Sequence, residues 1–372
     1  MKKKIRKKPS AQVFKPLESE PVLIRTVQPA SSRNQQLVRI GSDCSGLCPE
    51  FLAARDVLFN DISHEFANDN NRSVRKFIQH FMPPRIMQCD IFTRNLLDLK
   101  ERLSLYSAGF PCDTFTKNGK QLGLRDLRGQ VLYYVLSFIE MKSPDSFILE
   151  NVAALATDFK ALFHEIIQFL RALSDGSGLR YNIYHMIIDT KTHGALPQSR
   201  KRIYIVGVKR TQMVRPFRFP QEVPMKTLKQ VLPMGTPSNN MQLSSHTFLQ
   251  NIAKSLEALK RAKHDIVSED FIIDVGGSEP HASLDISPCI TRTRAGARGY
   301  YSTLRNRMLT IDDMMILQGY DPEEFRGWSQ VVSPRQMGMM LGNAMTRSVM
   351  ERLVRAVFLA MGFNVKKDRF DC

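Results

Sequence analysis

Apolar runs and polar breaks alternate regularly over residues 36–208 of the chain. Runs typical of strands occur at 37–42, 57–61, 86–90, 103–108 and 146–149, and helical patterns occur at 49–57, 130–142 and 159–174. Residues 181–189 and 202–208 close the series as a pair of strands. Strands that alternate with helices predict a layered α/β domain with a largely parallel sheet. Ligands of such sheets gather outside the carboxyl ends of the strands.

This regular pattern is absent on either side of the segment. Residues 1–35 combine a lysine run with Pro, Ser and Gln and are typical of a flexible basic arm. Residues 209–305 are polar, rich in proline and irregular, and the helical pattern returns from Arg307 to an apolar helix at 346–361. We therefore predict a basic arm (1–35), an α/β domain (36–208, completed by 330–372) and a second domain (209–329).

Charge indicates a polyanionic partner. The chain of 372 residues has 53 Lys and Arg against 36 Asp and Glu, a net charge of +17, which favours binding to nucleic acid. No apolar run approaches the roughly 18 residues of a membrane helix, and the six cysteines do not form a disulfide framework. We expect a monomer that binds no membrane or metal, located in the nucleus if the source is eukaryotic and otherwise in the cytoplasm.

The first α/β unit could bind a nucleotide-like cofactor. Gly41 and Gly46 flank a strand-to-helix turn, where a missing side chain lets the backbone approach a ligand. Asp61 would end the second strand, where a carboxylate can accept hydrogen bonds from ribose hydroxyls. Asp90 would end the third strand, near an adenine amino group. The same residues are equally consistent with turn glycines and helix caps.

Three further segments carry candidate chemistry at the same edge of the sheet. Cys112 lies in the turn-rich segment 109–119, where exposure beside Lys117 favours the thiolate. Glu150 ends the apolar strand at 146–149, as a functional acid or a helix cap. Arg200 and Arg202 lead into the last strand, and alternation would send both side chains to one face, as a site or as a solvated charge run.

The order and separation of these segments resemble those of the cytosine-5 DNA methyltransferase family. Three more fragments extend the resemblance. They are Asp-Leu-Arg-Gly at 126–129, Arg-Met-Leu-Thr with Leu-Gln-Gly-Tyr at 307–310 and 317–320, and Gln with Gly-Asn-Ala at 336–344. The resemblance covers about 36–208 and 287–360. It implies a Rossmann-like methyltransferase core with a mixed, mostly parallel sheet, plus a small irregular target-recognition domain.

The resemblance also implies a reaction. Cys112 would add to C6 of a cytosine flipped out of the duplex, Glu150 would hold the base edge, and Arg202 with Arg200 would clamp the pyrimidine carbonyl or a nearby phosphate. The methyl donor would be S-adenosyl-L-methionine. Its predicted contacts are Gly46, Asp61, Asp90 and Asn343, and the predicted nucleic-acid contacts are Lys117, Arg292, Arg294 and Arg298.

Three positions depart from the family pattern. Cys44 replaces an aromatic residue and Cys48 a glycine in the first turn, and Asp113 replaces the glutamine after the nucleophile. Two alternatives to DNA methylation stay open. One is the same chemistry on tRNA or other RNA, and the other is a catalytically silent homologue that binds nucleic acid.

Overall fold

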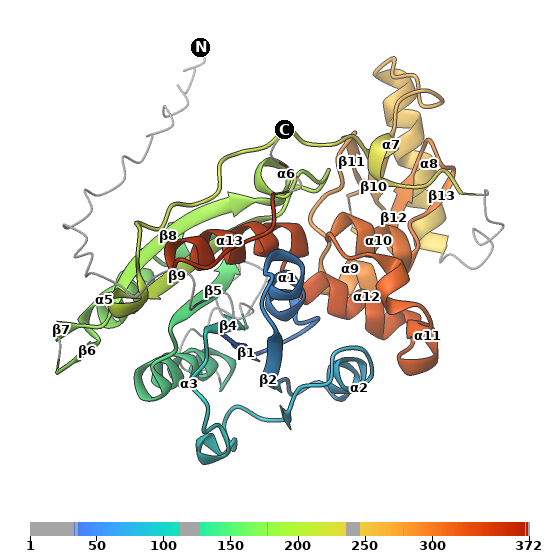
Figure 1. Cartoon of the computed structure of the whole chain (residues 1–372). Coiled ribbons are helices and arrows are strands. Elements are labelled where there is room, and N and C mark those ends of the chain that lie inside the picture. Colours follow the sequence, from blue (N-terminus) through green and yellow to red (C-terminus); the bar gives the residue numbers. More distant parts are fainter. Residues whose placement is uncertain are drawn as a thin grey trace, which may run out of the picture.

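The computed structural model describes residues 33, 36–111, 127–176, 178–235, 246–277, 279–368 and 370. The larger part of the molecule is built around a seven-stranded sheet (Figure 1). Its strands lie side by side in the order β3-β2-β1-β4-β5-β9-β8. Its strands are β1 (Val38–Asp43), β2 (Ile62–Asn68), β3 (Ile86–Gln88), β4 (Leu105–Gly109), β5 (Ser146–Val152), β8 (Tyr181–Asp189) and β9 (Lys201–Lys209). The first five run parallel, whereas β9 is antiparallel to both β5 and β8. The predicted Rossmann-like core with a mixed, mostly parallel sheet is confirmed.

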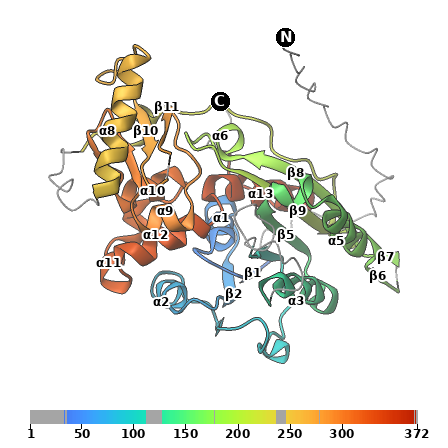
Figure 2. The same ribbon diagram turned by 180° about the vertical axis from the view of Figure 1, so that it is seen from behind.

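Helices cover both faces of this sheet (Figures 1 and 2). Helices α1 (Pro49–Val57) and α13 (Arg347–Ala360) share one apolar core with β1, β5 and β9. Helices α3 (Leu127–Lys142) and α5 (Lys160–Ala172) share another with β4 and β5 on the opposite face. The apolar helix at the end of the chain therefore belongs to the large sheet.

The prediction of a second strand at 57–61 is wrong. Val57 is the last residue of α1, and the strand that follows is β2, which begins only at Ile62. The sequence of β2 lacks the apolar pattern of a buried strand, because two of its buried residues, His64 and Glu65, are polar. The His64 ring nitrogen Nδ1 bonds to the Met82 carbonyl, and Glu65 pairs with Arg85. Residues from other segments thus supply hydrogen-bond and ion-pair partners to these two buried side chains, which their polarity alone would place at the surface.

A smaller lobe is built on a second sheet of short strands, in the order β11-β10-β12-β13. These are β10 (Phe271–Asp274), β11 (His281–Leu284), β12 (Tyr300–Ser302) and β13 (Arg307–Met308). Helix α8 (His246–Arg261) packs on this sheet through Ile252, which shares a core with Ile273 and Tyr301. The region is therefore more regular than the sequence indicated, since strands of two to four residues leave little periodicity to detect.

A layer of helices, most of them from the C-terminal part, joins the lobes. Helices α2 (Arg72–Phe81), α9 (Arg292–Gly296), α10 (Ile311–Leu317) and α12 (Pro334–Asn343) contribute to one apolar cluster with Leu47, Cys48 and Leu52 of the first turn and α1. Close packing needs glycine here, because a Cβ on Gly342 would meet the Arg292 backbone nitrogen at 2.2 Å. Asn343 and Arg292 are thereby brought to one place.

The remaining elements are short. They are α4 (Ala154–Thr157), α6 (Thr190–His193), α7 (Leu228–Val231), α11 (Trp328–Val331), β6 (Ser174–Asp175), β7 (Gly178–Leu179) and the 3-10 turns at Leu96–Asp98, Arg210–Gln212 and Pro322–Phe325. Among the described residues, no helix is both long enough and apolar enough to cross a membrane.

Candidate active site

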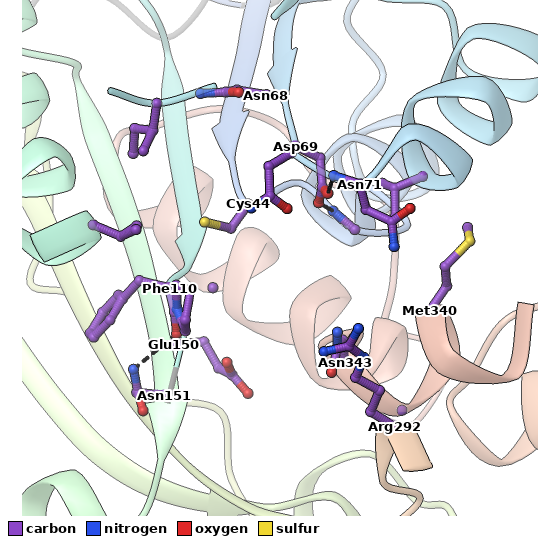
Figure 3. Close-up of a pocket in the computed structure, with 18 of the residues that line it drawn as sticks. Cys44, Asn68, Asp69, Asn71, Phe110, Glu150, Asn151, Arg292, Met340 and Asn343 are labelled. Atoms are coloured by element: carbon purple, nitrogen blue, oxygen red, sulfur yellow. Dashed lines mark hydrogen bonds between the residues drawn. The ribbon is translucent and has the colours of Figure 1, made fainter. Parts of the chain in front are cut away.

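A cavity of about 300 Å³ lies at the carboxyl ends of the parallel strands (Figure 3). Residues that follow or end β1, β2, β3, β4 and β5 line it on the side of the large sheet, and residues of α9 and α12 line it on the side of the smaller lobe. The sheet edge predicted from the sequence therefore carries a cavity with walls from both parts of the molecule.

The turn after β1 forms one end of this cavity. Gly46 has a φ of +54° and its N–H donates to the Asp69 carboxylate at 3.1 Å. Asp69 follows β2 directly, and its other carboxylate oxygen accepts the N–H of Asn71 at 2.9 Å. Burial raises the pKa of Asp69 above its ordinary value, although these two hydrogen bonds oppose the shift.

Two cysteines occupy left-handed backbone positions in the same turn. Cys44 has a φ of +51° and lines the cavity, while Cys48 has a φ of +47° and is wholly buried. Burial raises the pKa of both thiols well above the usual range, and neighbouring carboxylates add to the effect. Both side chains are therefore neutral thiols at neutral pH.

The structure separates the two acids predicted to hold the nucleotide part of a cofactor. Asp90 lines the cavity and accepts the N–H of Phe92 at 3.0 Å. Asp61 instead precedes β2, is exposed, and does not line the cavity. The placement of Asp61 at the carboxyl end of a strand is thus corrected, and Asp69 is the acid at that end of β2.

Glu150 lines the other end of the cavity and is the fifth of the seven residues of β5. It pairs in register with Gly109 of β4, and only 7% of the residue is exposed. The Arg202 Nε atom lies 3.0 Å from a Glu150 carboxylate oxygen. Next to it, the Asn151 amide donates to the Phe110 carbonyl at 3.1 Å, so that the segment entering the predicted nucleophile loop is tied to β5. Cys112 and Lys117 themselves lie outside the described residues.

The two arginines share one neighbour but differ in role. Arg200 is 2% exposed and donates to the carbonyls of Ile290 and Ala344 at 2.8 and 2.7 Å, so its guanidinium joins the lobes. Both guanidinium groups reach the sulfur of Cys289, at 3.4 Å from Arg200 and 3.6 Å from Arg202. Their side chains are thus on one side, as alternation predicted.

Cys289 contacts both arginines of this site and was not predicted from the sequence. Burial raises the pKa of its thiol, but the two neighbouring arginines more than offset this effect and leave the pKa below the ordinary value. Nothing in the local sequence signals this, because the arginines come from a segment almost ninety positions earlier.

The predicted nucleic-acid contacts in the smaller lobe are distributed unevenly. Arg292 is exposed and lines the cavity beside Asn343, which ends α12. Arg298 is exposed, whereas Arg294 pairs with Asp274 at 2.9 Å. Of the three arginines, Arg292 is therefore the one at the cavity.

Comparisons with known proteins agree with this geometry. Residues 52–359 match the family model for C-5 cytosine-specific DNA methylase. The chain is 31% identical over 250 residues to the type II methyltransferase M.NgoBI of Neisseria gonorrhoeae, which covers 66% of this chain and 70% of that protein. It is 23% identical over 314 residues to the type II methyltransferase M.Bsp6I of a Bacillus species, covering 80% of this chain and 91% of that protein.

Solved structures show the same fold. The methyltransferase EhMeth of Entamoeba histolytica superposes with a TM-score of 0.61 at 15% identity, over 87% of this chain and 98% of that one. DNMT2 of Spodoptera frugiperda superposes with a TM-score of 0.60 at 17% identity, over 86% of this chain and 99% of that one. The predicted enzyme class, a DNA cytosine-5 methyltransferase, is confirmed by the family match and the type II relatives. The chain therefore belongs to the C-5 cytosine-specific DNA methylase family.

Proposed function

We propose that the chain methylates C5 of a cytosine flipped out of duplex DNA, through a transient bond between Cys112 and C6 of the base. One observation carries the proposal. Glu150, paired with Arg202, lines the same cavity as Asp69 and Asp90. The acid that we assign to the base and the two that we assign to the nucleoside therefore open onto one space.

The end of the cavity near β1–β3 fits S-adenosyl-L-methionine, which supplies an electrophilic methyl group to C5 when bound. Asp69, placed after β2, would accept hydrogen bonds from the ribose hydroxyls in place of Asp61. Asp90 would face the adenine, Gly46 leaves room for close approach of the backbone, and Asn343 would lie toward the methionine part. Carboxylate oxygens that accept hydrogen bonds and a glycine turn that allows close approach are the features that a nucleoside requires.

The end near β5 suits a pyrimidine. Cytosine C5 is poorly nucleophilic, but a thiolate that adds to C6 saturates the 5,6 double bond and makes C5 enamine-like. Glu150 would hold N3 and the 4-amino group while this bond forms, and Arg202 would bind the pyrimidine carbonyl or a nearby phosphate. Loss of the C5 proton then restores the double bond and expels the Cys112 sulfur. Arg200 supports this end by anchoring the segments around Ile290 and Ala344.

The target base has to leave the duplex before it can enter the cavity, at a cost of a few kcal/mol. Contacts between the smaller lobe and the DNA backbone would offset this cost. Arg292, exposed at the cavity edge, and Arg298 are the residues of this lobe that we assign to phosphate contacts.

Labelled S-adenosyl-L-methionine tests the substrate. We expect duplex DNA to acquire label and total tRNA to stay unlabelled, whereas label in tRNA alone would overturn the DNA assignment. The covalent route is tested with DNA containing 5-fluorocytosine, whose C5 cannot lose its substituent. A denaturant-stable adduct should form with the wild type and with Cys89→Ser, in which an exposed cysteine is changed, but not with Cys112→Ser. Methylation that persists in Cys112→Ser would exclude the covalent mechanism.

A further inference from the structure

A buried ion pair lies behind the cavity, between residues that the mechanism leaves unused. Asp43, the last residue of β1, is wholly buried and pairs with the Arg94 guanidinium, whose side chain is 3% exposed. The same carboxylate accepts the Tyr106 hydroxyl at 2.5 Å and the Asn68 amide at 2.9 Å. One carboxylate thus connects the ends of β1 and β2 with β4 and with the segment that contains Arg94.

Arg94 is fixed from other directions as well. It donates to the Tyr134 carbonyl at 3.2 Å, and its guanidinium lies 4.8 Å from the centre of the Phe138 ring. Both of these residues belong to α3, on the face of the sheet where Tyr106 and Phe138 stack. A charged group enclosed by aromatic rings has lost most of its hydration, which costs several kcal/mol per ion. The attraction between the two charges offsets part of this cost.

The segment that Arg94 anchors forms part of the cavity wall. Asp90, Ile91 and Phe92 line the cavity, and Phe92 packs edge to face on the Tyr134 ring at 5.0 Å. Arg94 follows only two residues later. The position of its guanidinium therefore limits where the carboxylate of Asp90 can lie.

We infer that Asp43 and Arg94 are positioning residues that hold the segment Asp90–Arg94 in the geometry needed to bind the adenosine part of the methyl donor. The inference rests on the proposed function. Two apolar residues of similar volume would avoid the cost of removing both charges from water, although they would leave the Tyr106 hydroxyl and the Asn68 amide without their acceptor. A directional ion pair instead fixes one arrangement of the segment, whereas apolar side chains permit several.

Replacing Asp43 and Arg94 singly and together distinguishes an effect on donor binding from an effect on stability. We would measure the dissociation constant for S-adenosyl-L-methionine by calorimetry, and the melting temperature, on the full chain with Arg94→Met, Asp43→Leu and the double substitution. The single variants should melt at lower temperature and bind the donor at least tenfold more weakly. The double variant should melt above Asp43→Leu, because it no longer buries an unpaired guanidinium, although the Tyr106 hydroxyl and the Asn68 amide still lack their acceptor. It should still bind the donor at least fivefold more weakly than the wild type, with unchanged affinity for DNA.

A matched control is Arg352→Met. Arg352 is also a buried arginine, paired with Asp368 at 3.0 Å on the far side of α13. The Arg352→Met substitution should lower the melting temperature without changing the dissociation constant for the donor. A double variant that binds the donor as tightly as the wild type would overturn the inference. If a single variant fails to fold, the double variant decides. A wild-type chain that does not bind the donor would instead refute the proposed donor site, and the inference with it.

Discussion

The burial of Glu50 predicts that the free energy of unfolding falls as pH rises toward neutrality. It lies in the first turn of α1 and is wholly buried. Burial raises its pKa from 4.5 to about 7, although the nearby Ser42 hydroxyl opposes the shift. Folding thus places an acid where its charged form is strongly disfavoured.

The sign and size follow from linkage. Between pH 4.5 and about pH 7 the folded chain keeps the Glu50 proton that the unfolded chain has released, so the free energy of unfolding falls as pH rises through this window. At 1.36 kcal/mol for each pKa unit, the loss reaches roughly 3 kcal/mol above the window. Glu50→Gln removes the ionisation while keeping the shape. The variant should therefore exceed the wild type in stability by up to about 3 kcal/mol at pH 8, and by much less at pH 5.

Urea denaturation followed by tryptophan fluorescence measures this difference. The chain has one tryptophan, Trp328, which packs against the core cluster that includes Cys48 at the start of α1. Glu257→Gln, at an exposed carboxylate of α8, should show the same pH dependence as the wild type. A Glu50→Gln variant whose stability relative to wild type is equal at pH 5 and pH 8 would refute the reasoning.

Three further results are expected. Asp69→Asn should weaken binding of S-adenosyl-L-methionine about tenfold or more, because a hydrogen bond to a charged acceptor is worth roughly 1.5–3 kcal/mol. Asp61→Asn should leave the affinity measured by calorimetry unchanged, and equal effects of the two substitutions would contradict the corrected placement. Gly207→Ala should lower stability by about 1–3 kcal/mol, since its Cβ would meet the Phe147 ring at 2.1 Å, and a variant with an unchanged melting temperature would count against the packing of β5 on β9. Arg298→Ala should reduce the slope of log affinity for DNA against log salt by about 1, and an unchanged slope would remove Arg298 from the interface.

The fold could be predicted where side-chain polarity and burial agree. The helix predicted at 49–57 has the observed bounds of α1, and the strand predicted at 181–189 has those of β8. The strand predicted at 202–208 is β9, which extends one residue further at each end. Prediction failed at β2, where His64 and Glu65 are buried with partners that the local sequence does not contain. The error moved the expected ribose-binding acid by eight positions along the chain, from Asp61 to Asp69.

The site divides in the same way. Glu150 and Asp90 could be placed at the cavity because each lies in or just after a strand with an apolar pattern in its own sequence, whereas Asn343 was predicted from the resemblance to the family; all three line the cavity. Cys289 and Arg94 could not, because their environment depends on how distant segments fold against one another. Arg94 meets Asp43 only through the packing of α3 on the sheet, and Cys289 meets its arginines only where the lobes join. The residues that are expected to touch substrate thus follow from local pattern and from the resemblance to the family, whereas those that hold them in place follow from tertiary packing.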